Sequence, residues 1–275
     1  MNVILLIVAS WWFSLANLVN ETAPPPVQWR VEPAETETSP GSSVDLVCSL
    51  DIPAGWHVYW SDPGASGAPT NFEFESLPPG VVVEPVRFQR PSVFSTKLGR
   101  VFGFEDQLVA AARVHVPDTA TVGSAIQLSV WGDWLLCQKA CYIGGGEKTV
   151  TIHIGQEGVP TDAASLVKSI PSPLRSRPDT RVSWDQDAGQ VVITGPMSSK
   201  GPPRVLIDRV PGVEVGHASV DVADGAFHLS LPVRLMPGDS MGQPARVRGL
   251  LIFGSSRYDP AWSFGIACDA DDSKP

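Results

Sequence analysis

Short runs of apolar and β-branched residues, interrupted at regular intervals by turn-forming residues, restrict the fold of this sequence more than any other feature. The chain holds 25 glycines and 26 prolines among 275 residues. Turn signals recur about every ten residues, which is typical of all-β sandwiches and barrels. Hydrophobic residues make up 43% of the chain, enough to build real cores. The pattern therefore predicts an all-β protein.

The first part of the chain contains enough predicted strands for one immunoglobulin-like β-sandwich over residues 41–155. Residues 44–50 alternate between the two faces of a strand, and residues 56–60 are rich in aromatic side chains. Residues 62–69 form a predicted turn-rich loop, and residues 89–100 a predicted long loop. The predicted strands are 44–50, 56–60, 72–75, 81–87, 108–116, 126–131 and 148–154.

A second all-β domain is predicted over residues 179–270, followed by a tail at 271–275. The connection, residues 156–178, contains a short helical pattern that starts at the capping residue Thr161 and is stopped by Pro171. We therefore expect two immunoglobulin-like β-sandwich domains joined by a short helical linker. The strands predicted for the second domain are 181–184, 191–194, 205–208, 227–233, 246–253 and 262–267.

The start of the chain predicts export from the cytoplasm. Residues 3–19 are apolar and uncharged, which indicates a secretory signal peptide over residues 1–23, removed near Ala16 or Ala23. An uncleaved anchor is the alternative, because the apolar run has about the minimum length of a membrane span. Residues 24–40, rich in proline, glutamate and threonine, are a predicted flexible lead-in. Both alternatives place the chain in a periplasmic or other extracytoplasmic compartment, where disulfides form.

The charge of the chain excludes two classes of partner. The formal net charge is −9 and the sequence pI is about 5.0. A negative surface repels both nucleic acid and an acidic membrane surface. We therefore expect no nucleic-acid partner.

Two of the four cysteines, Cys137 and Cys141, are separated by only three residues and follow a predicted strand. On a continuous strand their Cα atoms would lie about 13 Å apart, whereas a disulfide requires less than about 7 Å. A bond between them therefore requires a turn at residues 138–140, with 148–154 as the return strand. A disulfide that closes so small a loop adds little stability. The pair suits a bond that is made and broken, and a small structural disulfide is the alternative.

The other two cysteines, Cys48 and Cys268, lie in the first and second predicted domains. An even number of cysteines in an oxidising compartment favours pairing. A Cys48–Cys268 disulfide would join the domains and close a long loop, which stabilises by about 4–5 kcal/mol in the entropic model. The alternative is two buried thiols that behave as small apolar side chains.

Three motifs together resemble a known family. Residues 55–60 read Gly-Trp-His-Val-Tyr-Trp and are followed by Asp62-Pro63-Gly64 and Ser66-Gly67; residues 102–105 read Phe-Gly-Phe-Glu, and residues 134–141 read Trp-Leu-Leu-Cys-Gln-Lys-Ala-Cys. The combination resembles the N-terminal periplasmic domain of the thiol:disulfide interchange protein DsbD, in particular its ScsB-like copper-sensitivity-suppressor subgroup. The likeness extends over about residues 30–155 and, more loosely, over the linker helix and second domain.

The resemblance implies that the cysteine pair cycles between dithiol and disulfide. Such a domain takes electrons from a membrane-embedded transporter, here a separate protein, and passes them to thioredoxin-like proteins. In the family a loop and aromatic side chains shield the pair, and Tyr59, Trp60 and Phe104 are the candidates here. Their alternative role is as part of the sandwich core.

Charged residues near the pair have both chemical and ordinary interpretations. Lys139 lies between the cysteines and would favour a thiolate. Asp133 and Glu105 are candidates for moving protons near the pair, and ordinary solvated carboxylates are the alternative. Thiol–disulfide exchange needs no cofactor, and we expect none.

Two further classes of function remain open. Soft thiolates of Cys137 and Cys141 are suitable Cu(I) ligands, although the nearest histidine in sequence is His153. No second ligand pair has the spacing of a closed zinc site, so we expect no metal site of that kind. A plain protein-binding sandwich would not require the cysteine pair at all.

Overall fold

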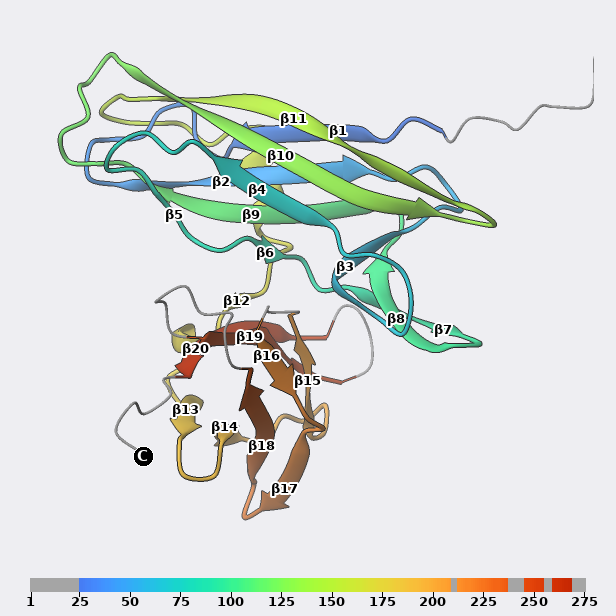
Figure 1. Cartoon of the computed structure of the whole chain (residues 1–275). Coiled ribbons are helices and arrows are strands. Elements are labelled where there is room, and N and C mark those ends of the chain that lie inside the picture. The colour runs from blue at the N-terminus through green and yellow to red at the C-terminus, as the bar shows by residue number, and fades with distance from the viewer. Residues whose placement is uncertain (1–24, 209–211, 237–244, 255–258, 269–275) are drawn as a thin grey trace, which may run out of the picture.

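The computed structural model describes residues 25–208, 212–236, 245–254 and 259–268, and these form two β-sandwiches (Figure 1). The predicted all-β class with two immunoglobulin-like domains is confirmed. The predicted signal peptide at 1–23 and the tail at 271–275 lie outside the described residues. None of the helices in the described ranges is long and apolar enough to cross a membrane.

The first sandwich consists of two large antiparallel sheets and one small sheet. One large sheet has the order β1-β2-β9-β5, with β6 also paired to β9, and the other has the order β11-β10-β4. The small sheet, β3-β8-β7, lies at one end of the sandwich (Figure 1). The bounds are β1 Gln28–Pro33, β2 Ser43–Asp51, β3 Val58–Gly64, β4 Asn71–Glu75, β5 Val82–Val83, β6 Arg87–Phe88, β7 Ser92–Thr96, β8 Gly99–Phe104, β9 Gln107–His115, β10 Ala125–Cys137 and β11 Cys141–His153.

Strands β2 and β9 are the centre of this domain because both of their faces are covered. Leu46 and Leu108, both 0% exposed, point into the core between the large sheets. The opposite face, including Val47 and Ala111, packs against Ala163 of helix α1 (Asp162–Val167). The predicted linker helix is therefore present, and it covers the outside of the first sandwich.

The second sandwich also has two sheets, with orders β12-β20-β19-β15 and β13-β14-β18-β16, and β17 also pairs with β18. Its core gathers apolar side chains of both sheets, among them Ile193, Phe227 and Phe253. The bounds are β12 Ser172–Pro173, the 3-10 helix η1 Leu174–Ser176, β13 Arg181–Asp185, β14 Gln190–Pro196, β15 Pro203–Ile207, β16 Val213–Val215, β17 Ser219–Ala223, β18 Ala226–Leu235, β19 Ala245–Phe253 and β20 Ala261–Cys268.

Several local predictions were wrong. The lead-in at 24–40 contains β1, which pairs with β2 because Trp29 is buried in the core. The predicted loop at 89–100 contains β7 and the start of β8, which pair as a hairpin. The predicted strand 81–87 is interrupted, and only its two ends, β5 and β6, pair with β9. The linker contains β12 and η1, whose Leu174 belongs to the second core.

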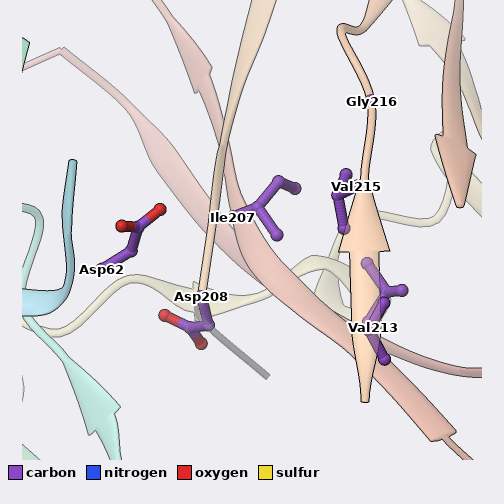
Figure 2. A pocket seen from close by; sticks show the side chains of 7 residues that line it. Asp62, Ile207, Asp208, Val213, Val215 and Gly216 are labelled. Carbon is purple, nitrogen blue, oxygen red and sulfur yellow. The ribbon is translucent and has the colours of Figure 1, made fainter. Parts of the chain in front are cut away.

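The two sandwiches pack directly against each other. Leu250 and Ile252 of β19 join the core cluster of the first domain. The Ser61 hydroxyl donates a hydrogen bond to Asp208 Oδ1 at 2.7 Å. A cavity of about 240 Å³ lies beside this contact. Figure 2 shows Asp62 and Asp208 on one side of it and Val213, Val215 and Gly216 on the other.

Candidate functional site

Cys137 and Cys141 lie at the tip of the hairpin formed by β10 and β11. The two strands pair along their full length, from Ala125 opposite His153 to Cys137 opposite Cys141. The turn at residues 138–140 is closed by a hydrogen bond from the Gln138 N–H to the Ala140 carbonyl, 3.0 Å long. The cysteines form a disulfide, with an S–S distance of 2.00 Å and Cα atoms 4.1 Å apart. The hairpin that the spacing predicted is therefore present.

The two halves of the disulfide have different environments. Cys137 is 2% exposed, whereas Cys141 is exposed. Cys137 is buried because β3 passes beside it: the His57 N–H donates to the Cys137 carbonyl at 3.0 Å, and the Cys137 N–H donates to the His57 carbonyl at 2.9 Å. Cys141 is therefore the half of the disulfide that is open to solvent, and Cys137 is the shielded half.

The small sheet β3-β8-β7 covers Cys137 as a cap. Tyr59 of β3 and Val101 of β8 are buried in one cluster with Cys137, and Phe94 of β7 and Leu135 of β10 pack against it. The cap is therefore an element of regular structure, and its apolar side chains exclude water from Cys137.

His57 links the members of the cap through its ring. Its Nε2 lies 3.3 Å from the Tyr59 hydroxyl, and its ring centroid lies 5.8 Å from that of Phe94. Burial lowers the pKa of His57, and the negative charge of Glu105 opposes this shift. Burial also raises the pKa of Tyr59. Both shifts favour the neutral forms of these side chains, so the cap over Cys137 is mainly uncharged.

Two glycines of the family motifs allow the cap to close. A Cβ atom on Gly103 would overlap the carbonyl oxygen of Val58, so glycine lets β8 lie close to β3. Gly67 has φ +104°, and a Cβ there would lie 2.6 Å from Tyr59 Cδ1. Gly67 therefore supports the Tyr59 ring from behind.

The supporting residues predicted from the sequence lie in different parts of the domain. Tyr59 lies in the cap, whereas Trp60 and Phe104, each 2% exposed, belong to the main core. Lys139 is exposed at the hairpin tip. Asp133 accepts a hydrogen bond from Asn71 at 3.2 Å. It precedes Cys137 by four strand residues, a distance of about 13 Å.

Phe94 and His57 were not among the supporting residues predicted from the sequence. Residues 92–96 alternate as Ser-Val-Phe-Ser-Thr, and this period-two pattern is the signal that marks β7. Glu105 is exposed, and among the predicted carboxylates it is the one whose charge acts on His57.

The predicted disulfide between Cys48 and Cys268 is not formed, although both residues are described. Cys48 is 0% exposed in the first core, and Cys268 is 1% exposed in the second. Burial raises the pKa of Cys48 to about 12. Each thiol therefore packs as a small apolar side chain inside its own domain, which was the alternative interpretation.

Potential metal ligands do not cluster in the ranges that the structure describes. Groups of three or more histidine, cysteine, aspartate or glutamate side chains suitable for a metal ion are not found there. Cys137 and Cys141, the two possible Cu(I) ligands named from the sequence, are joined in a disulfide.

Comparison with known proteins gives one family match and several structural likenesses. No curated protein matches the chain. Among solved structures, the N-terminal periplasmic domain of ScsB from Proteus mirabilis is 14% identical, with 88% of this chain and 93% of that chain covered and a TM-score of 0.50. This likeness shows a shared fold that includes both sandwiches.

Other solved structures have lower TM-scores. The periplasmic chaperone SfaE is 8% identical, with 86% of this chain and 99% of that chain covered and a TM-score of 0.25. The C-terminal fragment of the major pilin GBS80 of Streptococcus agalactiae is 11% identical, with coverages of 91% and 98% and a TM-score of 0.28.

The family match falls on the sandwich that carries the disulfide. It extends from the first residue of β1 almost to the end of β11, and it includes β3, the cap and the cysteine hairpin. Residues 28–152 match the family model of the N-terminal domain of the thiol:disulfide interchange protein DsbD.

Proposed function

We propose that the protein is an extracytoplasmic thiol:disulfide oxidoreductase that passes electrons through the Cys137–Cys141 pair to thioredoxin-like proteins. One observation carries the proposal: the disulfide lies at the tip of a hairpin, with Cys141 exposed and Cys137 buried. Exchange needs one sulfur that a partner can reach. The match of residues 28–152 to the DsbD N-terminal family model supports this chemistry.

In this function the disulfide is first reduced by a dithiol donor, for which we propose a separate membrane electron transporter. One donor thiolate attacks the Cys141 sulfur, a mixed disulfide forms, and Cys137 leaves as a thiolate that takes up a proton. The second donor thiolate then attacks the donor sulfur of the mixed disulfide and releases Cys141. The donor is oxidised to a disulfide, and the pair gains two electrons and two protons.

Reduced Cys141 then passes these electrons on. Its thiolate attacks the disulfide of a thioredoxin-like protein, and Cys137 resolves the mixed disulfide by attacking Cys141. The acceptor leaves as a dithiol, and the Cys137–Cys141 bond is restored. Residues 1–23 are the proposed export signal that delivers the chain to the compartment where this cycle operates.

The exchange chemistry is tested by equilibrating the protein in dithiothreitol buffers of graded potential and by serine variants. We expect a potential above about −300 mV, the region of labile disulfides. Cys141→Ser abolishes exchange, and Cys137→Ser stops at a mixed disulfide because the resolving thiol is missing. Both variants keep the fold, since so small a disulfide loop contributes little stability.

The control is Cys48→Ala, which removes a thiol far from the site in the first core. It lowers the free energy of unfolding but leaves exchange by the folded protein unchanged. A potential well below about −300 mV, or full exchange activity of Cys137→Ser, would contradict the proposed function.

A further inference from the structure

The hydrogen-bonding pattern of the hairpin determines which main-chain groups of β11 face outward. On β10, the N–H and C=O of Cys137 are both bonded to His57, on the side away from β11. Cys137 and Cys141 are therefore a non-hydrogen-bonded pair, in which the main-chain groups of both residues point away from the hairpin. The N–H and C=O of Cys141 thus point to the outer edge of β11.

This orientation repeats at every second residue of an antiparallel strand. Ile143 lies opposite Leu135 and Gly145 lies opposite Asp133, both two-residue steps from the disulfide. Their N–H and C=O groups therefore point to the same outer edge as those of Cys141. In the described part of the chain, β10 is the one strand paired with β11. The outer edge of β11 is bonded at its far end, where the Thr38 N–H donates to the His153 carbonyl at 2.9 Å, and no strand pairs with it from Cys141 to Gly145.

The side chains along this edge are also unusual for a solvated strand. Ile143 is 90% exposed, the highest exposure among the large apolar side chains of the described residues. It lies two residues after Cys141, on the same face and about 7 Å away. Residues 144–146 are all glycine. Cβ atoms on Gly144 and Gly145 would overlap Trp134 and the Gly132 carbonyl of β10, whereas a Cβ on Gly146 would meet nothing within 4 Å.

We propose that the edge of β11 from Cys141 to Gly145 is the docking strand for the protein partner of the redox pair. An extended segment of the partner, next to its reactive cysteine, adds as a strand to this edge, and an apolar side chain of that segment covers Ile143. The inference rests on the proposed function, because attack on the Cys141 sulfur fixes where the partner chain must pass.

The position of the cap supports this side of approach. On the Cys137 side, β3 occupies the main-chain groups, and Tyr59, Phe94 and Val101 cover the sulfur. A partner chain that reaches the Cys141 sulfur therefore lies along the open edge of β11. Main-chain hydrogen bonds then supply affinity, and the Ile143 contact supplies selectivity for a protein over a small thiol.

The experiment compares reduction of the disulfide by reduced thioredoxin with reduction by dithiothreitol, in wild type and in Ile143→Asp. Loss of a buried apolar contact lowers the rate with thioredoxin by about tenfold. The rate with dithiothreitol stays within about twofold, because the sulfur itself remains exposed. The matched control is Val222→Asp on β17, an apolar side chain that is 52% exposed on the second sandwich. It changes neither rate.

A second pair of variants separates main chain from side chain. Ile143→Ala removes the side chain only, and Ile143→Pro also removes the outward N–H, which an edge strand tolerates. The proline variant reacts more slowly with thioredoxin than the alanine variant, while both melt near the wild-type temperature. Equal rates with thioredoxin for wild type, Ile143→Asp and Ile143→Pro overturn the inference.

The outcomes also separate this inference from the function on which it rests. If neither thiol reduces the wild-type disulfide, the proposed function itself fails. If both thiols reduce it, and Ile143→Asp changes only the self-association of the chain in sedimentation, the edge serves a second copy and the docking proposal fails.

Discussion

At the scale of single residues, Tyr59 and Gly67 form a pair that keeps the cap closed. Tyr59 is 7% exposed and belongs to the cluster around Cys137. Gly67 lies directly behind its ring and has a positive φ that side chains with a Cβ rarely adopt. A substitution at Gly67 therefore acts on Cys137 through Tyr59 as well as on the local backbone.

We expect Gly67→Ala to lower the free energy of unfolding by about 2–4 kcal/mol, because backbone strain adds to the overlap with Tyr59. The displaced ring opens the Cys137 side, so dithiothreitol reduces the disulfide faster. The control is Gly123→Ala, where φ is +89° and no atom lies within 4 Å of the added Cβ. This variant introduces the backbone strain alone, which lowers the free energy of unfolding by about 1–2 kcal/mol. Urea unfolding measures the free energy of unfolding, and the kinetics of reduction by dithiothreitol measure the opening of the Cys137 side. Equal reduction rates for the two variants would argue against Tyr59 as a shield of Cys137.

At the scale of elements, the β7–β8 hairpin decides how far Cys137 is covered. Phe94 faces inward toward His57 and Cys137, while its neighbour Val93 is 51% exposed. Among the described strands, β3 is the one that pairs this hairpin with the rest of the domain. A hairpin with one sheet neighbour and few buried side chains opens at lower cost than β2 or β9, which are covered on both faces.

We expect Phe94→Ala to open this hairpin without unfolding the domain. Stability falls by about 1–2 kcal/mol, since the side chain is only partly buried. Hydrogen exchange at the amides of β7 and β8 becomes faster, and so does reduction by dithiothreitol. Val93→Ala is the control, because it removes an exposed side chain from the same strand. Unchanged protection of β7 and β8 in Phe94→Ala would show that other contacts hold the cap.

The contrast between these elements also explains what the sequence could predict. The strands β2, β9 and β10 carry long apolar patterns, and the hairpin at Cys137 and Cys141 follows from the limits on disulfide geometry. The cap has only short patterns between glycines and serines, so β7 resembles a loop. The wrong prediction of a Cys48–Cys268 disulfide had another cause: whether these two residues meet depends on how the two domains pack, which residue spacing does not encode.

At the scale of the whole molecule, a buried carboxyl group lies where the two sandwiches meet. Asp208 follows β15 in the second domain and accepts a hydrogen bond from Ser61 of β3. The cavity that it lines also contains Asp62 of the first domain (Figure 2). The contact therefore connects the second sandwich to β3, the strand that directly follows His57, which is bonded to the Cys137 main chain.

Burial raises the pKa of Asp208, the nearby charge of Asp62 acts in the same direction, and the Ser61 hydrogen bond and Arg248 oppose them. Folding thus favours the protonated form. The contribution of this group to stability is fully present below the ordinary carboxyl pKa of about 4 and is lost as the pH rises through the raised value.

We therefore expect the stability difference between Asp208→Asn and wild type to depend on pH. The amide is always neutral, and its oxygen still accepts the Ser61 hydrogen bond, so the variant loses nothing as the pH rises. Its free energy of unfolding minus that of wild type is smallest near pH 4 and increases toward pH 7. Urea unfolding at pH 4, 5, 6 and 7 measures the difference. The prediction is wrong if the difference for Asp208→Asn is flat or falls as the pH rises. Folding would then not disfavour ionisation of this carboxyl group, and the contact between the sandwiches would not weaken with rising pH through Asp208.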